Sequence, residues 1–166
     1  MSNKSKRIFL GICIVVPFAI YCYIYYSSMI RNAPFRFSDF ESIELSYGYP
    51  GEMYNIYDSK TSDYQYLNKN DELVQVKLKM RKDDLLYLHR KAMELGFWNV
   101  KDDMTTDSEE VQAEKNILRY KLTYNYTEKS KTVVLDADFP GNPKMVGAAK
   151  STIDEVIKMI ADVQSR

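Results

Sequence analysis

The chain has 166 residues, which suits one folded domain with a single hydrophobic core. Its 23 basic and 23 acidic residues cancel, yet every Asp and Glu lies after residue 31, so that part of the chain is net acidic. Phosphate backbones bind basic surfaces, and this charge balance therefore argues against nucleic acid as a partner.

Residues 8–30 form an apolar stretch without a single charged side chain or histidine. A bilayer core needs about 20 such residues in helical form, so the stretch predicts a transmembrane helix. Lys4, Lys6 and Arg7 precede it, and positive charge stays on the cytoplasmic side. We therefore expect a single-pass membrane protein of the cell envelope: cytoplasmic N-terminus (1–7), transmembrane helix (8–30), juxtamembrane connector (31–38) and extracytoplasmic domain (39–166).

A cleaved signal peptide is the rival interpretation, because it also combines a charged start with an apolar middle. Cleavage requires small residues, whereas bulky tyrosines follow Ala19, which favours an uncleaved signal-anchor. Cys13 and Cys22 both lie in the apolar stretch. The rest of the chain therefore has neither a disulfide nor a thiol nucleophile.

Alternating apolar and polar residues predict four strands, at 41–48, 53–58, 63–67 and 74–80. The turns between them contain Gly, Pro, Asn and Asp, and the spacing is typical of an antiparallel meander. A helical period follows Met80 and stops before Gly96, which we expect in a left-handed cap, with Phe97 and Trp98 folding back onto the core.

The second half predicts a hairpin, with strands at 118–126 and 132–139, and then a helix. Asn142 is its expected cap and Pro143 its first residue. The predicted fold is an α+β domain of order ββββ-α-ββ-α, with an antiparallel sheet and both helices on one face.

This order, together with the segment from Leu85 through Gly96, Phe97 and Trp98 to Asp103, resembles an uncharacterised family of bacterial secreted or membrane-anchored envelope domains. The resemblance covers about residues 40–163. It implies the meander, a helix ending in Gly-Phe-Trp, a hairpin and a final helix, and it implies an envelope location. No activity is assigned to that family, so the resemblance implies no catalytic residue.

Three sets of polar residues are candidates for chemistry. His89, the only histidine, lies at the edge of the helical stripe, where a partly buried structural histidine is commoner than a general base. Asp136 and Asp138 share one strand face and suit calcium or acid–base work, but solvated strand carboxylates are commoner. The acidic loop contains Asp102, Asp103, Asp107, Glu109 and Glu110. These carboxylates could hold a calcium ion, but an acidic loop in contact with water needs no metal.

Six tyrosines fall within twenty residues around the first turns: Tyr47, Tyr49, Tyr54, Tyr57, Tyr64 and Tyr66. Aromatic faces beside polar groups suit both sugar rings and protein partners. About half of them should point into the core. We name Tyr49, Tyr57 and Tyr64 as candidate binding residues, and expect Tyr49 and Tyr57 to be exposed.

Common motifs of enzymes are missing from the sequence: it has no P-loop, GxGxxG, GxSxG, HExxH or CxxC. We therefore expect a non-enzymatic, membrane-anchored binding domain without a cofactor, whose partner is another envelope protein. The alternative is a module for cell-wall or surface glycan that uses the tyrosine-rich meander. A hydrolase or metal-dependent enzyme around His89, Asp136 and Asp138 ranks third.

Overall fold

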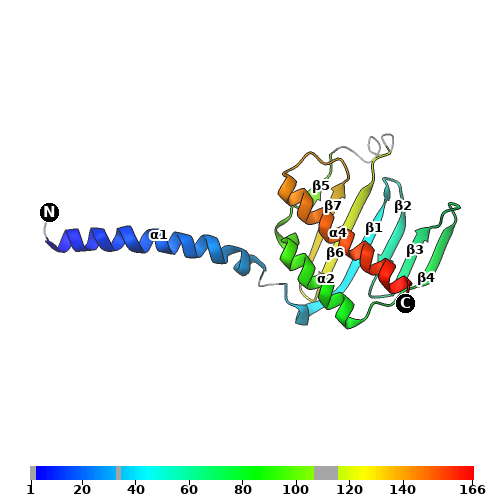
Figure 1. Cartoon of the computed structure of the whole chain (residues 1–166), viewed down its shortest axis with the longest axis horizontal. Coiled ribbons are helices and arrows are strands. Elements are labelled where there is room, and N and C mark those ends of the chain that lie inside the picture. Colours follow the sequence, from blue (N-terminus) through cyan, green and yellow to red (C-terminus); the bar gives the residue numbers. More distant parts are fainter. Residues whose placement is uncertain (1–2, 33–34, 107–115) are drawn as a thin grey trace. The chain divides into compact units, whose positions relative to one another are not determined.

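The computed structural model describes residues 3–32, 35–106 and 116–166, which fall into two compact units, 1–34 and 35–166. The first unit contains one helix, α1 (Asn3–Asn32), with Pro17 inside it. The second unit is the folded domain, and its strands and helices are drawn in Figure 1.

Helix α1 corrects the prediction of a membrane anchor. Among the described residues, no helix is both long and apolar enough for a bilayer crossing. The predicted transmembrane helix at 8–30 is therefore contradicted, and so is the single-pass location with the domain outside the cytoplasm.

The domain contains seven strands in one sheet of order β4-β3-β2-β1-β6-β7-β5. The strands are β1 (Phe40–Tyr49), β2 (Glu52–Asp58), β3 (Asp63–Leu67), β4 (Leu73–Lys77), β5 (Asp103–Met104), β6 (Arg119–Tyr126) and β7 (Ser130–Asp136). All neighbours are antiparallel except β5 and β7, which run parallel. The α+β class is confirmed, but the predicted order ββββ-α-ββ-α is wrong because β5 lies between α2 and β6. The predicted purely antiparallel sheet is also wrong, because β5 runs parallel to β7.

Two helices, α2 (Lys82–Leu95) and α4 (Pro143–Gln164), cross the same face of the sheet (Figure 1). A capping hydrogen bond marks the start of each helix, and a glycine ends α2. The Asp84 carboxylate accepts a hydrogen bond from the Arg81 backbone, and the Asn142 side chain accepts one from the Lys144 backbone. Gly96 ends α2 with φ +77°, so the predicted left-handed cap is present.

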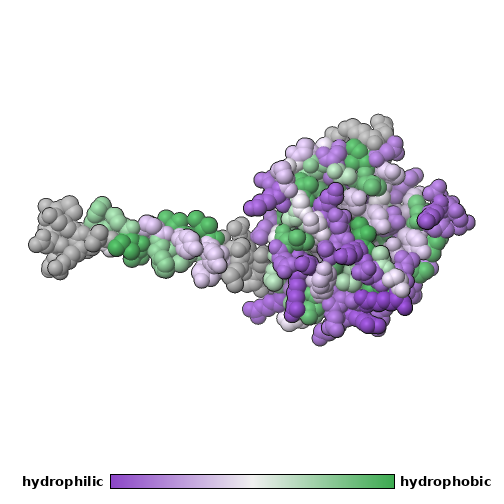
Figure 2. Space-filling view, in the orientation of Figure 1, coloured by the Kyte–Doolittle hydropathy of each residue, from purple (hydrophilic) through white to green (hydrophobic). Residues whose placement is uncertain are grey.

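The core lies between this helical layer and the sheet. Leu45 and Tyr57 from the sheet and Leu88 and Ile153 from the helices are each 1% exposed. Short 3-10 turns, Phe37–Asp39 and Phe97–Asn99, close one end of the core with aromatic rings. The side of the domain drawn in Figure 2 is mostly hydrophilic, with scattered apolar residues.

Candidate binding site

The face of the sheet opposite α2 and α4, which we call the open face, presents the other half of each strand. Ile56 pairs with Ser46 on one side and with Gln65 on the other, and Gln65 pairs with Gln75. Successive side chains of a strand point to opposite faces, and Tyr57 is in the core. Tyr54, Ile56 and Asp58 of β2 therefore point to the open face.

Three hollows border these outward residues of β2. The first has a volume of about 530 Å³ and reaches Tyr54, the second of about 370 Å³ contains Ile56 and Asp58, and the third of about 310 Å³ contains the same two residues. The hollows thus follow one strand along the open face. We call this series the β2 groove.

The first hollow lies where the β1–β2 and β3–β4 turns meet at one end of the sheet. It is lined by Gly48, Tyr49, Glu52, Tyr54, Asn55, Leu67, Asp71, Leu73 and Leu118. Tyr49 is 40% exposed and Tyr54 is 39% exposed, so two aromatic rings are available to a ligand beside carboxylates and an amide. A Cβ on Gly48 would lie 2.4 Å from the Glu52 carbonyl oxygen, so glycine is needed for the close approach of β1 and β2.

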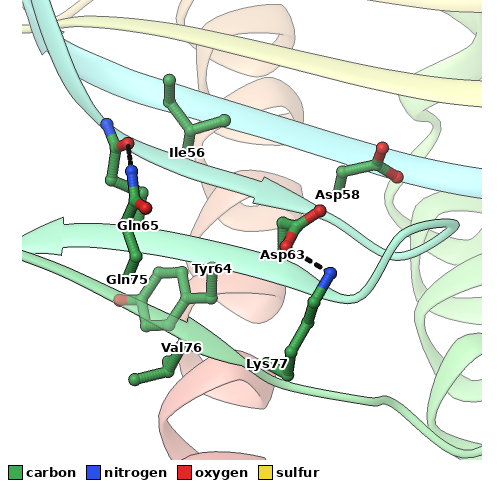
Figure 3. Close-up of a pocket in the computed structure, with 8 residues that line it drawn as sticks. All are labelled: Ile56, Asp58, Asp63, Tyr64, Gln65, Gln75, Val76 and Lys77. Carbon is green, nitrogen blue, oxygen red and sulfur yellow. Dashed lines mark hydrogen bonds and ion pairs between the residues drawn. The ribbon is translucent and has the colours of Figure 1, made fainter.

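The second hollow carries two side-chain amides at one side, away from Asp63 and Lys77 (Figure 3). The Gln75 amide donates to the Gln65 carbonyl oxygen at 2.8 Å, and the Gln65 amide donates to the Tyr54 backbone oxygen at 3.1 Å. These bonds hold two amides from neighbouring strands in line beside Ile56. Each amide has both donors and an acceptor, and the pair therefore gives the groove a polar wall that can serve hydroxyl groups.

A row of carboxylates crosses the far end of the groove, because Glu44 pairs with Asp58 and Asp58 with Asp63. Each has a separate partner. Asn125 donates to Glu44 at 2.6 Å, the Lys60 backbone donates to Asp58 at 2.7 Å, and Lys77 lies 2.6 Å from Asp63. The hydrogen bond from Lys77 holds the pKa of the Asp63 carboxyl below its usual range. Within the residues that the structure describes, no three acidic, His or Cys side chains are arranged to hold a metal ion.

Only part of the predicted tyrosine set lies where it was expected. Tyr49 is exposed and lines the first hollow, but Tyr57 is 1% exposed, which corrects its expected exposure, and burial raises its pKa to about 12. Tyr64 is 9% exposed and is packed in the core, with its edge at the second hollow. Sequence reasoning missed Tyr54, although its position three residues before Tyr57 would have placed it on the open face once Tyr57 was assigned to the core.

His89 lies away from the groove, buried among aromatic rings on the helical side. Its Nδ1 is 2.8 Å from the Tyr126 hydroxyl, and the rings of Phe37, Trp98 and Phe40 surround it. Burial lowers the pKa of His89, with a further contribution from Arg90. The structure therefore places this side chain in the neutral, packed position of a structural histidine.

Asp136 also makes structural contacts. It is 1% exposed and accepts hydrogen bonds from Arg119 Nε at 2.7 Å and from the Thr106 backbone at 2.9 Å. Asp138 accepts a longer hydrogen bond from the Thr106 hydroxyl at 3.3 Å. Thr106 thus donates to both carboxylates, and His89 is not brought to either of them.

The acidic loop is described only at its start. Asp102 pairs with Lys131, and Asp103 accepts hydrogen bonds from Thr105, which lowers the pKa of Asp103. The remaining loop carboxylates, Asp107, Glu109 and Glu110, lie outside the described residues.

Gly96, Phe97 and Trp98 form a packing element, as their sequence suggested. Phe97 is fully buried and Trp98 is 7% exposed. Trp98 stacks on Phe35 with ring centroids 4.5 Å apart, and Lys129 lies over the other ring of this pair, 4.4 Å from the Phe35 centroid. The start of the domain is thereby fixed to the end of α2.

Comparison of the chain with known proteins gives no significant match. The chain matches no protein-family model, and no curated protein or solved structure is significantly similar to it.

Proposed function

We propose that the domain is a non-catalytic binding module that holds a neutral oligosaccharide in the β2 groove, with Tyr49 and Tyr54 as its aromatic platform. The observation that carries the proposal is that these two exposed tyrosines line one hollow together with Glu52, Asn55 and Asp71. A sugar ring has apolar C–H faces and a rim of hydroxyls, and this hollow offers a partner for each.

The size of the groove supports a ligand of this class. Its first hollow, of about 530 Å³, falls in the range of about 300–1,000 Å³ that is typical of small-molecule sites. The amides of Gln65 and Gln75 continue the polar lining beyond Tyr54. A chain of a few sugar units can therefore extend from the tyrosines along β2.

The charge of the groove selects against anionic ligands. Its lining includes five carboxylates and two ammonium groups: Glu44, Glu52, Asp58, Asp63, Asp71, Lys77 and Lys121. Negative charge in a concave surface repels polyanions such as sulfated glycans. Of the two partner classes considered from the sequence, a protein would be expected to use a broad apolar patch, whereas this groove carries amides and carboxylates beside its tyrosines.

The test is to screen the full chain against an array of neutral glycans that includes chitotetraose and cellotetraose, and then to measure the best ligand by calorimetry. We expect saturable binding that Tyr54→Ala weakens at least tenfold, because the ring that stacks on the sugar is lost. Tyr87→Ala is the matched control, since Tyr87 is 40% exposed but belongs to α2 on the opposite side of the sheet. The proposal is overturned if no neutral glycan binds, or if both variants lose affinity equally.

A further inference from the structure

Strand β4 is an edge of the sheet. Among the described strands it pairs with β3 alone, whereas the opposite edge, β5, has only two residues. An edge strand presents a row of backbone N–H and C=O groups that can pair with another chain. Two of its apolar side chains are also uncovered: Leu73 is 49% exposed and Val76 is 36% exposed.

Hydrogen bonds at both ends of β4 show which backbone groups are available. The Leu78 N–H donates to the Ser62 oxygen at 2.7 Å, and the Asn68 N–H donates to the Glu72 oxygen at 3.0 Å. Both bonds join directly opposite residues of the β3–β4 register. In an antiparallel ladder such pairs alternate with non-bonded ones, so even-numbered residues of β4 bond to β3. Leu73, Gln75 and Lys77 therefore direct their backbone groups outward.

The sequence around β4 is self-complementary when reversed. It starts with the acidic Asp71 and Glu72, continues through apolar residues and ends with the basic Lys77 and Lys79. An antiparallel copy would bring the acidic start of one strand to the basic end of the other. A parallel copy would instead place like charges side by side, which is unfavourable.

We propose that β4 pairs antiparallel with β4 of a second copy of this chain, about a two-fold axis beside Gln75. In this register Gln75 faces Gln75 of the second copy, Val74 faces Val76, and Leu73 faces Lys77. Leu73 of one copy then pairs with Lys77 of the other, and Gln75 pairs with Gln75. Every outward N–H and C=O group of these residues therefore has a partner in the second copy. A two-fold axis makes the same patch serve both subunits, as closed dimers require.

Lysine on an edge strand commonly discourages such pairing. Here the Lys77 ammonium lies 2.6 Å from Asp63 of the same copy. The attraction between copies therefore rests mainly on Lys79, which faces Asp71 of the second copy in this register. The proposed pairing does not depend on the oligosaccharide, because it uses the strand edge and the proposed ligand uses the open face. A failure of either proposal would therefore leave the other standing.

The first test is a disulfide placed on the axis. Gln75→Cys is introduced into the full chain with Cys13→Ser and Cys22→Ser, which remove the natural thiols. Opposite residues of a hydrogen-bonded antiparallel pair have Cα atoms about 5.5 Å apart, within disulfide range. We expect a covalent dimer under mild oxidation. Met93→Cys in the same background is the control, since Met93 is 49% exposed on α2, and we expect it to remain monomeric.

The second test blocks the edge without removing backbone hydrogen bonds to β3. Gln75→Pro deletes an outward N–H, whereas Val76→Pro deletes an N–H that bonds to β3 and should lower the stability of the domain. By analytical ultracentrifugation we expect the wild-type chain to form dimers whose dissociation constant rises at least tenfold in Gln75→Pro, with an unchanged circular dichroism spectrum.

Three results would overturn the proposal: a wild-type chain that is monomeric at all concentrations, a dimer that Gln75→Pro leaves intact, or cross-linking of Met93→Cys as efficient as that of Gln75→Cys. The last two would place the contact elsewhere, for instance along α1. The cross-link decides the matter even if Gln75→Pro fails to fold.

Discussion

The Nδ1 atom of His89 lies 2.8 Å from the hydroxyl of Tyr126, and together they join α2 to the last residue of β6 inside a layer of aromatic rings. Both side chains are 5% exposed. Burial disfavours the charged form of each, so it lowers the pKa of His89 and raises that of Tyr126. The pair is therefore neutral in the folded domain at neutral pH.

This burial predicts a loss of stability in mild acid. The unfolded chain binds a proton at His89 near pH 6.5, and the folded domain only at a lower pH. The contribution of neutral His89 to the free energy of unfolding is thus fully present above about pH 6.5. It declines as the pH falls toward the pKa of His89 in the folded domain, by up to about 1.4 kcal/mol per pH unit. Urea unfolding from pH 5 to 7.5 measures it. His89→Gln should flatten this part of the profile, and an unchanged slope would contradict the prediction.

Replacement by alanine should have opposite effects on stability at two glycines, Gly96 in the C-terminal cap of α2 and Gly147 inside α4. Gly96→Ala should lower the free energy of unfolding by about 1 kcal/mol, because Gly96 has φ +77° and nothing lies within 4 Å of an added Cβ. The cost is then one of backbone conformation alone. Gly147→Ala is the control: Gly147 is an exposed residue inside α4 with equally open surroundings, and alanine there should stabilise the domain by up to about 1 kcal/mol. Thermal unfolding of both variants distinguishes the two signs.

Asp136→Asn should be among the most damaging single changes in the domain. It removes the carboxylate charge that lies 2.7 Å from Arg119 Nε, and loss of one charge of a buried ion pair costs about 3–5 kcal/mol. Replacing both residues, with Arg119→Met and Asp136→Leu, should recover much of that loss.

Asp63→Asn provides the matched control for this prediction. It makes the same chemical change in the solvent-exposed pair with Lys77, where water screens the interaction, and the effect on urea unfolding should be much smaller. Equal losses in the two asparagine variants would show that burial of the Arg119 pair is not what stabilises it.

Gly48→Ala should disturb the tyrosine end of the β2 groove. The added methyl group would approach the Glu52 carbonyl oxygen to 2.4 Å, so β1 and β2 must separate, at a cost of about 1–3 kcal/mol. If the oligosaccharide proposal holds, affinity should fall as well, because Tyr49 and Tyr54 flank this contact. Thermal unfolding and glycan titration of the same preparation separate the two effects, and an unchanged melting temperature would contradict the expected clash.

The regular elements of the domain were predictable because their signals are local. Alternation placed the strands around Leu45, Val74 and Leu122, and the Asn142-Pro143 pair placed the start of α4. Strand β5 was not predictable, since two residues carry no period. Asp103 and Met104 become a strand only through their parallel pairing with Val134 and Leu135.

The site was harder to predict because it depends on register between strands. Tyr57 is buried because it lies opposite Leu45, and the local sequence of β2 does not reveal that pairing. The same register turns Tyr54 outward, next to Tyr49 of the preceding strand. Composition therefore pointed to the tyrosine-rich meander, while the choice of tyrosines required the folded sheet.

The central position of β1 has a consequence for biosynthesis. One side of β1 pairs with β2, which follows directly, but the other side pairs along its length with β6, which begins only at Arg119. On the ribosome, the nascent chain must therefore carry β1 half-paired while α2 and the following loop are made. Contacts between distant segments form slowly. This makes the closure of β6 onto β1 the step at which the growing polypeptide most needs protection from premature association.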